Sequence, residues 1–402
     1  MTVRVPPVLR HRDFRWLITG VTVSSFGNAI TTIALAFTVL DLGGSTTDLG
    51  IVMAAFAACE VITTLYGGVL GDRFDRQRLM VSAAVASAVV ELLLVVLLVN
   101  HHLSLVALTL LGSLLGVVQA LNRPSSSAMT RLTVPDADLT AAVTIRPVLN
   151  TLASTVGFAV AGVLVSAIGV GWTIGVDAAT FALSALSFAM IDVEHTPIPS
   201  GKSMLADLGD GLREVLRHTW LWLLIGQALL YHLFYGGVQQ VLGPVVVGEG
   251  ISPAAWGESL GFLTAGFFVG SLICLRWRPR RALLAGTACL SGTAFFPLAM
   301  AYAHHLWPIL LGAFVHGVGL YIFTIFWDLS INQNVAEDKL ARVYAFDEVG
   351  SFVARPIGLL ITGPLAAAVG TRTWLVVVAV VIGGSSLLAL TLPDVRRLER
   401  TD

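Results

Sequence analysis

Charged side chains are scarce in this sequence. Of its 402 residues 12% are Asp, Glu, Lys or Arg, whereas a soluble globular domain carries about 25%. Hydrophobic residues make up 56% of the chain, and its mean hydropathy is +0.83. A protein in water needs polar side chains over its surface. The shortage therefore excludes a water-soluble enzyme, a nucleic-acid-binding protein and a disordered scaffold, and it places most of the chain in lipid.

Net charge and cysteine are low as well. The net charge is −1, so no strong field attracts nucleic acid or an acidic partner. Cys59, Cys274 and Cys289 each lie in an apolar run, which fits buried hydrophobic side chains better than a disulfide framework or a zinc site. The histidine pairs at 101–102 and 304–305 have no carboxylate or cysteine cluster beside them. We therefore expect no metal and no cofactor.

Long apolar runs are abundant. A helix needs about 20 apolar residues to cross a bilayer, and the sequence contains twelve such runs. The first run is too long, and too polar at Ser24, Ser25 and Asn28, to be a cleaved signal peptide. The sequence therefore predicts an all-α membrane protein with twelve transmembrane helices. The expected spans cover residues 14–40, 46–71, 79–99, 103–127, 138–168, 170–191, 219–247, 252–275, 282–303, 305–330, 339–368 and 371–392.

The basic residues predict the orientation of these spans. If the amino terminus lies in the cytoplasm, 21 of the 24 Lys and Arg residues fall in cytoplasmic segments. Arg372 lies outside, and Arg146 and Arg355 lie within spans. An excess of basic residues in cytoplasmic loops is the usual topology signal. We expect a multi-pass protein of the cell inner (plasma) membrane with both termini in the cytoplasm.

The chain also repeats itself. The twelve residues from Val134 align without gaps with those from Val335, an offset of 201, and the nine from Ala161 align with those from Thr362 at the same offset. Two six-span halves that both start inside form a parallel repeat about an axis along the membrane normal. The sequence therefore predicts two pseudo-symmetric six-helix bundles over residues 1–191 and 219–402.

The expected bundles are joined by a cytoplasmic linker over residues 192–218. Four leucines at helical spacing stand opposite charged side chains there and predict an amphipathic helix: Leu205, Leu208, Leu212 and Leu216. Such a helix lies either on the inner membrane face or against the protein's own cytoplasmic side.

The loop between the second and third spans carries a recognisable motif. It reads GGVLGDRFDRQR over residues 67–78, and a degraded copy occupies residues 270–281. This loop resembles the signature of the major facilitator superfamily, as do the twelve spans, the two halves and the long central loop. The resemblance implies a gating loop in which Gly68 allows close helix packing, Asp72 caps a helix, and Arg73 and Arg76 anchor the cytoplasmic edge. Asp75 departs from the family, which usually has glycine there.

Several shorter motifs resemble one branch of that superfamily, the exporters that include macrolide-efflux and siderophore-export proteins. The motifs are HRDFR at 11–15, SFG at 25–27, IAL at 33–35, GS at 44–45, LG at 49–50 and the segment 212–224. The resemblance implies a secondary active transporter that exports a small amphiphilic compound in exchange for protons by alternating access.

Polar residues recur at helical spacing in two repeat-related spans. Arg146, Asn150 and Ser154 share one face of the fifth span, and the 201-residue offset maps them onto Asp347, Ser351 and Arg355 in the eleventh. In the superfamily these spans lie where the halves meet. We therefore predict that the two stripes form contacts between the halves that break and re-form during transport, with static interhelical packing as the alternative.

Three carboxylates within spans are candidates for proton coupling. Ionisable groups within a bilayer are costly and are functional candidates by default, and burial favours their protonated form. The candidates are Glu60 in the second span, Glu91 in the third and Asp347. Asn28 stands where many members of the branch have an aspartate, so we expect Glu60 or Asp347 to take its place in coupling, with hydrogen-bonded structural roles for these carboxylates as the alternative.

The resemblance also implies a central cavity lined by spans 1, 4, 7 and 10. Aromatic and neutral polar residues on these spans suit a bulky, partly apolar ligand, with ordinary interhelical hydrogen bonding as the alternative. The cavity candidates are Asn28, Gln119, Gln227, Tyr231, Tyr235, Gln239, His316 and Tyr321.

The sequence thus predicts a monomeric exporter whose partners are a small-molecule substrate, protons and the lipid bilayer. An importer or facilitator on the same fold is the main alternative. A membrane enzyme would need a catalytic cluster at a membrane face, which the short loops do not supply. A receptor or scaffold on this fold would move no protons with a substrate. The sequence has no nucleotide-binding Gly-x-x-x-x-Gly-Lys-Ser/Thr loop, which argues against direct ATP drive.

Overall fold

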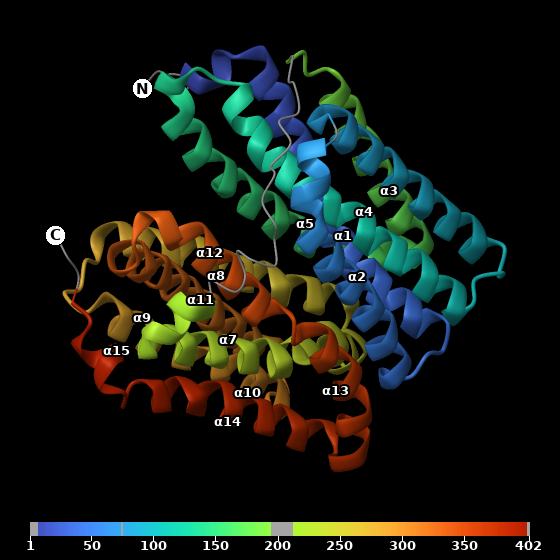
Figure 1. The fold of residues 1–402 in the computed structure, drawn as a ribbon. Helices are drawn as coiled ribbons and strands as arrows, with labels where there is room; N and C mark the ends of the chain where they lie inside the picture. Colours follow the sequence, from blue (N-terminus) through green and yellow to red (C-terminus); the bar gives the residue numbers. More distant parts are fainter. Residues whose placement is uncertain (1–6, 74, 194–211, 400–402) are drawn as a thin grey trace, which may run out of the picture. The chain divides into compact units, whose positions relative to one another are not determined.

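The computed structural model describes residues 7–73, 75–193 and 212–399, with side chains outside positions 65–73, 123–124, 337–338, 341 and 345. The described elements are helices joined by short turns (Figure 1). The first five long helices are α1 (Arg12–Asp41), α2 (Thr46–Arg73), α3 (Arg76–Val99), α4 (Leu105–Leu132) and α5 (Asp136–Ala189). The later ones are α7 (Thr219–Gly237), α8 (Pro253–Arg276), α9 (Ala282–Leu290), α10 (Phe295–Tyr302), α11 (Leu306–Asn334), α12 (Glu337–Phe352), α13 (Arg355–Val369), α14 (Thr371–Ala389) and α15 (Pro393–Arg397).

Over the described residues, eleven helical segments are long and apolar enough to cross a membrane. One of them, α5, has 54 residues, which at about 1.5 Å per residue far exceeds the roughly 30 Å hydrocarbon core. Its helical geometry breaks at Gly169. Gly157 before the break and Thr180 after it both approach α1 at Phe26 and Gly27, so the chain turns back at Gly169. Since α5 therefore supplies two spans, the predicted twelve-helix architecture is confirmed.

The turn at Gly169 recurs in the second half of the chain. Gly370, 201 residues later, separates α13 from α14 and has a φ of 89°, against 82° at Gly169. This left-handed region is open to glycine at little steric cost. Two turns at the offset that the sequence alignment predicts support a structural repeat.

Close helix contacts repeat at the same offset. A Cβ at Gly157 would collide with the carbonyl oxygen of Phe26 in α1, and one at Gly358 would collide with that of Leu233 in α7. The same relation links Gly116 to Phe56 and Gly317 to Leu263. In both cases the glycines are 201 residues apart and their partners 207. The two halves therefore bring corresponding helices together in the same way.

A polar contact near the first helix of each half repeats as well. His11 Nε2 lies 2.7 Å from Asp138 Oδ2, and Lys339 Nζ donates to Glu214 Oε2 at 2.8 Å. Asp138 and Lys339 are 201 residues apart, at the start of α5 and α12. In the first half the acid lies on α5 and its histidine partner precedes α1. In the second half the basic residue lies on α12 and the acid precedes α7.

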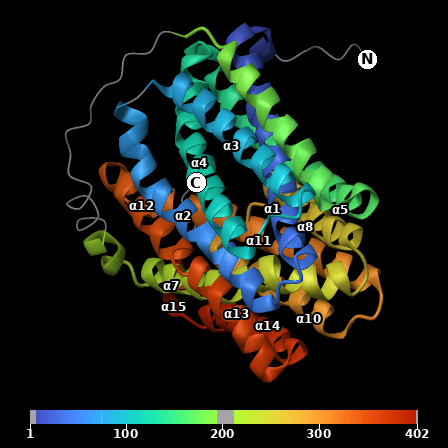
Figure 2. The ribbon, with the colours of Figure 1, turned by 90° about the vertical axis from the view of Figure 1, so that its right-hand side faces the viewer.

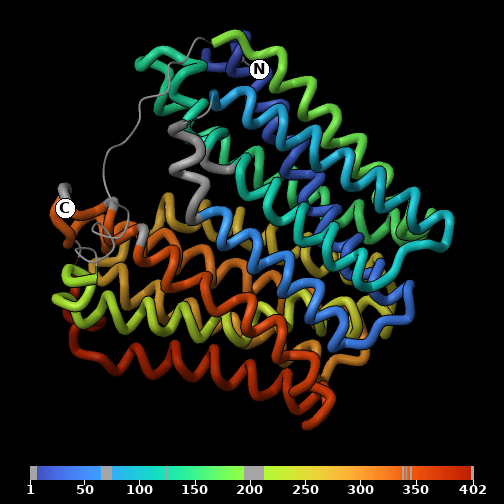
Figure 3. The backbone as a smooth tube through the Cα atoms, turned by 45° about the vertical axis from the view of Figure 1, so that its right-hand side comes forward, coloured from blue at the N-terminus to red at the C-terminus, as the bar shows by residue number. Residues whose placement is uncertain are grey.

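The chain divides into two compact units. The first comprises Met1–Gly44 and Ala55–Ser200, and the second Ser45–Ala54 and Gly201–Asp402; we call them the first and second half. In the first half, α3 and α5 pack together, α1 packs against α5, and α4 packs against α3 (Figure 2). In the second, α14 (dark red in Figure 3) runs beside α7.

Apolar side chains cover the outside of both halves as well as the inside. Val89, Leu92 and Val96 of α3 are each more than half exposed, as are Trp307 and Leu311 of α11. Such surfaces are unstable in water but match the hydrocarbon of a bilayer, so the exposed apolar residues confirm a multi-pass membrane protein.

Part of the predicted linker helix is described. Leu205 and Leu208 lie outside the described residues, and a short helix covers residues 212–217. Val215 is buried there, whereas Leu212 and Leu216 are 40% and 58% exposed. Whether this helix lies on the membrane face or against the protein's own cytoplasmic side stays a prediction.

The close contact at Gly358 predicts an unusual response to alanine. We expect Gly358→Ala to destabilise the protein by about 1–3 kcal/mol, because the new Cβ forces α13 away from the backbone of α7. Gly384→Ala in α14 is the matched control, since a Cβ there meets nothing within 4 Å; it should be neutral or stabilising by up to about 1 kcal/mol. Thermal unfolding in detergent measures both, and equal melting temperatures would contradict the packing.

The Glu214 contact predicts a pH dependence. The hydrogen bond from Lys339, together with the charges of Lys339, Arg217 and His218, holds the pKa of Glu214 below its ordinary 4.5. This carboxylate therefore stabilises the fold above its ordinary pKa, and the contribution disappears as pH falls through the lowered value. We expect Glu214→Gln to lower the free energy of unfolding at neutral pH by about 1 kcal/mol or less, seen as a lower melting temperature, and to match the wild type once both are strongly acidified. A difference that persists in acid would contradict the interpretation.

Candidate functional site

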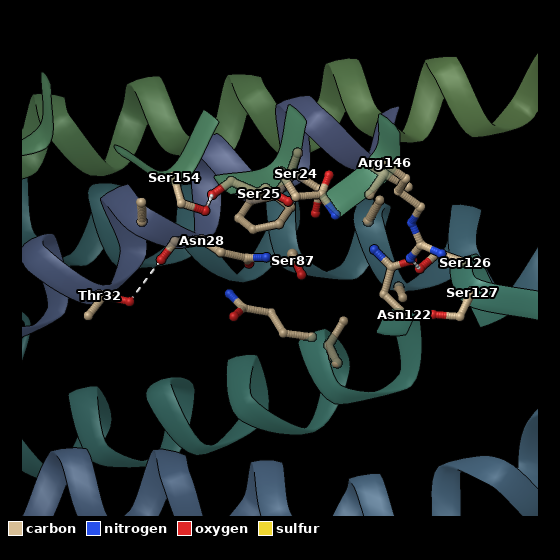
Figure 4. Close-up of a pocket in the computed structure, with 18 of the residues that line it drawn as sticks. Ser24, Ser25, Asn28, Thr32, Ser87, Asn122, Ser126, Ser127, Arg146 and Ser154 are labelled. Atoms are coloured by element: carbon tan, nitrogen blue, oxygen red, sulfur yellow. Dashed lines mark hydrogen bonds between the residues drawn. The ribbon is translucent and has the colours of Figure 1, made fainter. Parts of the chain in front are cut away.

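The first half contains a polar pocket of about 470 Å³. Helices α1, α3, α4 and α5 line it (Figure 4). Its polar residues are Ser24, Ser25, Asn28, Thr32, Ser87, Gln119, Asn122, Ser126, Ser127, Arg146, Asn150 and Ser154, and its larger apolar residues are Val21, Val118, Phe158 and Phe181. A cavity of this size, with converging polar groups and some aromatic surface, is typical of a small-molecule site.

The polar residues that line the pocket recur at helical spacing. Ser24, Asn28 and Thr32 follow one another at four-residue intervals on α1, so their side chains lie on one face. Arg146, Asn150 and Ser154 repeat that spacing on α5. The pocket therefore lies where the polar faces of otherwise apolar helices meet.

Arg146 is the cation of the pocket. It donates to Ser126 Oγ at 2.8 Å and to Thr130 Oγ1 at 3.1 Å, both on α4, while its Nε has no partner. In the described part of the first half no carboxylate pairs with it. Arg146 is thus held in place by neutral groups and keeps both its positive charge and a free donor.

Three amide oxygens of the pocket have unused hydrogen-bonding capacity. The Oδ1 atoms of Asn28, Asn122 and Asn150 are buried and have no partner among the described residues. A buried polar atom without a partner costs free energy, and a bound molecule with donor groups would remove that cost. Figure 4 shows Arg146 and Asn122 toward one end of the pocket and Asn28 and Thr32 toward the other.

Two of the sequence-predicted cavity residues, Asn28 and Gln119, line this pocket. The others lie in the second half. The Tyr231 hydroxyl lies 2.6 Å from Nε2 of His316, whose Nδ1 donates to the carbonyl of Thr293 at 2.8 Å. Tyr235 stacks on Tyr231 with ring centroids 5.1 Å apart.

Two of the remaining cavity candidates have partners inside the second half. Gln227 donates to Ser386 Oγ at 2.8 Å, and Tyr321 stacks on Phe267. Gln239 is half-buried, within the π-helical turn that follows α7. Contact of all these residues with substrate stays a prediction.

The predicted coupling carboxylates have different environments. Glu91 is buried in α3, whereas Glu60 in α2 is only partly buried. Asp347 of α12 accepts hydrogen bonds from Trp327 Nε1 at 2.9 Å and from Ser351 Oγ at 3.3 Å. The structure thus pairs Asp347 with neutral donors and buries Glu91 most deeply.

The structure adds Asp177, which the sequence analysis missed. Asp177 is 1% exposed, and the Thr31 hydroxyl lies 2.7 Å from its Oδ2 and 3.2 Å from Glu91 Oε1. A signal was available, because Asp177 is the only ionisable residue between Arg146 and Asp192. A lone carboxylate in an apolar run of that length is a functional candidate.

The polar stripes differ between the halves. Arg146 and Asn150 stay on one continuous helix, whereas α12 ends at Phe352 and Arg355 begins α13. Asp347 and Ser351 therefore share a helix face, and Arg355 follows a break in the helix. Contact between the stripes of the two halves stays a prediction.

The predicted gating loop lies mostly outside the described side chains, including those of Gly68, Asp72 and Arg73. Arg76 begins α3. Asp75 accepts a hydrogen bond from the backbone N–H of Arg78 at 2.8 Å and caps α3. Asp75, the departure from the family motif, thus has a structural role. In the described part of the chain, no three metal-ligating side chains gather.

Twelve spans in two repeated halves and a polar pocket among the helices define a membrane transporter. The family model of the Major Facilitator Superfamily matches residues 17–290. The chain belongs to that superfamily.

Known proteins resemble the chain over nearly its full length. It is 25% identical to the multidrug efflux pump Tap of Mycobacterium tuberculosis over 94% of this chain and 92% of the pump. It is 19% identical to macrolide efflux protein A of Streptococcus pyogenes, over 94% and 96% of the two chains. The solved structure of the nucleoside transporter NupG superposes with a TM-score of 0.75 at 12% identity, over 96% and 99% of the chains, which supports the fold.

The pocket predicts the effect of filling it. We expect Asn28→Phe to lower transport at least tenfold, because the ring occupies the space between α1 and α4, and losing about 1.4 kcal/mol of binding already costs tenfold in affinity. Val89→Phe adds the same ring to the exposed face of α3 and should leave transport near the wild-type rate. Transport and melting temperature are measured together, and full activity of a folded Asn28→Phe protein would exclude the pocket as the substrate site.

Proposed function

We propose that this transporter exports small amphiphilic compounds, including drug-like molecules and secondary metabolites, in exchange for protons. The observation that carries the proposal is the pocket, which combines one unneutralised cation, three unpartnered amide oxygens and aromatic surface. The names of its relatives, a multidrug efflux pump and a macrolide efflux protein, support the direction and the substrate class.

The pocket suggests how such a compound is held. The polar end of the molecule lies against Arg146 and the asparagine amides, and its apolar body packs on Phe158 and Phe181. Few of these contacts need one fixed geometry, because dispersion and burial of apolar area are not directional. A site of this kind accepts compounds of varied shape that share a polar head and an apolar body.

Transport by this fold requires the site to open to each side in turn. The two halves move relative to each other about the substrate site, in the manner of parallel-repeat transporters. The excess of basic residues in the assigned cytoplasmic segments orients both termini inward in the plasma membrane. Protons returning into the cell then supply the free energy for export. We expect the monomer to be the working unit.

An expression test examines the direction and the coupling. In a bacterium that lacks its own major drug pumps, the protein should lower cellular accumulation of erythromycin and of the neutral compound chloramphenicol severalfold, and collapsing the pH gradient with nigericin should abolish the effect. Inverted vesicles should accumulate the same probes when acidified inside, because their interior corresponds to the outside of the cell.

Matched variants control this test. Val89→Phe protein should export at the wild-type rate, and Asn28→Phe protein at the rate of cells with an empty vector. Faster uptake by intact cells, with no accumulation in inverted vesicles, would identify an importer. Export that survives loss of the pH gradient would contradict proton coupling.

A further inference from the structure

Two buried carboxyl groups meet at one hydroxyl behind the wall of the pocket. Glu91 of α3 and Asp177 of α5 are each 1% exposed. Thr31 of α1 contacts both, with its Oγ1 at 3.2 Å from Glu91 Oε1 and 2.7 Å from Asp177 Oδ2. The two carboxyl oxygens therefore lie within about 6 Å of each other, a range in which like charges strongly disfavour double ionisation.

Hydrogen counting shows that this cluster lacks a proton when both acids are ionised. The Thr31 hydroxyl has one hydrogen, yet it lies within hydrogen-bond distance of three acceptors, the two carboxyls and the carbonyl of Gly27 at 3.3 Å. In addition, Glu91 Oε2 is fully buried and has no partner. One added proton turns a carboxyl into a donor and reduces the cost of burying it.

No cation neutralises the pair among the described side chains of the first half. The ionisable neighbour of Glu91 is Asp177, and the remaining polar neighbours are Thr31 and Thr180. The other described ionisable side chains on the surrounding helices are Arg12, Asp13, Arg15 and Asp41 on α1, Asp48, Cys59 and Glu60 on α2, Arg76 and Arg78 on α3, Arg131 on α4, and Asp136, Asp138 and Arg146 on α5. None of them contacts either acid.

The second half has apolar residues at corresponding positions. Thr31 corresponds to Val238 at the 207-residue offset of the first helices, and Asp177 corresponds to Val378 at the 201-residue offset; both valines are fully buried. Valine fills the same place without a polar group. The fold therefore does not need a polar group at the positions of Thr31 and Asp177, and these two side chains are peculiar to the first half.

The acid pair is connected to the pocket. Gln119, which lines the pocket, donates from Nε2 to Thr31 Oγ1 at 3.5 Å. Ser87, one turn before Glu91, and Phe181, one turn after Asp177, are also pocket residues. A change in hydrogen bonding at Thr31 therefore reaches a side chain that faces the substrate.

We propose that Glu91, Thr31 and Asp177 form the proton-binding site of this transporter and exchange one proton per cycle. When the pair holds its proton, the protonated carboxyl donates to Thr31, and the other carboxylate accepts the Thr31 hydrogen. When the proton leaves, that carboxyl group has no hydrogen to donate to Thr31 and becomes an acceptor. It then competes with Thr31 for the hydrogen of the Gln119 amide, which shifts Gln119 in the pocket wall. Proton and substrate are thereby coupled. The coupling, though not the proton site itself, rests on the proposed export function.

Infrared difference spectroscopy tests the proton site without any substrate. In purified wild-type protein, raising the pH should remove the carbonyl band of one protonated carboxyl group. Glu91→Gln and Asp177→Asn should each remove this band or shift its frequency and the pH at which it disappears, because the remaining acid has lost the like charge and the shared hydrogen bond of the pair. Asp41→Asn, at the exposed end of α1, should keep it. A band that titrates unchanged in both variants of the pair would overturn the proposal.

A transport assay tests the coupling. In proteoliposomes, accumulation of chloramphenicol driven by a pH gradient should fall roughly tenfold in Glu91→Gln, within the range of typical coupling free energies, while chloramphenicol exchange at equal pH persists. Thr31→Val should reduce gradient-driven accumulation in the same way, and Thr31→Ser should restore it, since serine keeps the hydroxyl. Gradient-driven accumulation that is intact in Glu91→Gln and Thr31→Val would overturn the coupling.

The two measurements separate the proton site from the export function. If the infrared band behaves as expected but wild-type protein moves neither chloramphenicol nor erythromycin, the export proposal fails and the proposal of the proton site stands. If wild-type export is proton-driven but the band is insensitive to both acid variants, the proton site fails and export stands. Thermal unfolding of every variant identifies those that do not fold, and Thr31→Val, which keeps both acids, then provides the test.

Discussion

The absence of water from the bilayer core is the constraint on which the structure depends. Every polar group within a span must find its partner in the protein, since lipid offers none. Backbone groups are satisfied within the helices, and hydroxyls such as that of Thr38 donate to the carbonyl four residues earlier. The polar side chains that remain converge on a few places, namely the pocket around Arg146, the acid pair behind it and the contacts of Asp347 and His316.

Duplication produced one scaffold twice, and the halves then diverged in their polar residues. The turns at Gly169 and Gly370 and the close contacts of Gly157 and Gly358 are shared, because helix packing tolerates few alternatives to glycine at such points. Polar positions were free to change. The first half places Arg146 and Asp177 where the second has Asp347 and Val378, so the proposed proton site belongs to the first half alone.

Most of the fold could be predicted because the hydropathy and the length of each apolar run are local properties of the sequence. The twelve spans, the repeat and the membrane class follow from apolar runs and from the 201-residue offset. The break between Phe352 and Arg355 could not be predicted, because neither the apolar pattern nor the repeat changes there. Asp177 was visible in the sequence as an isolated acid, but its role depends on Thr31 and Glu91, which lie 146 and 86 residues away along the chain.

The sequence by itself determined that this protein is a multi-pass membrane protein of duplicated design, since the scarcity of charge and the length of each apolar run leave no other stable arrangement, and its motifs resemble those of the major facilitator superfamily. Tertiary structure alone decided which polar residues act together. Helical spacing predicts the face on which a side chain lies but not the helix that the face meets. Three helices that are distant in sequence converge on Thr31, and that convergence turns two separate acids into one site.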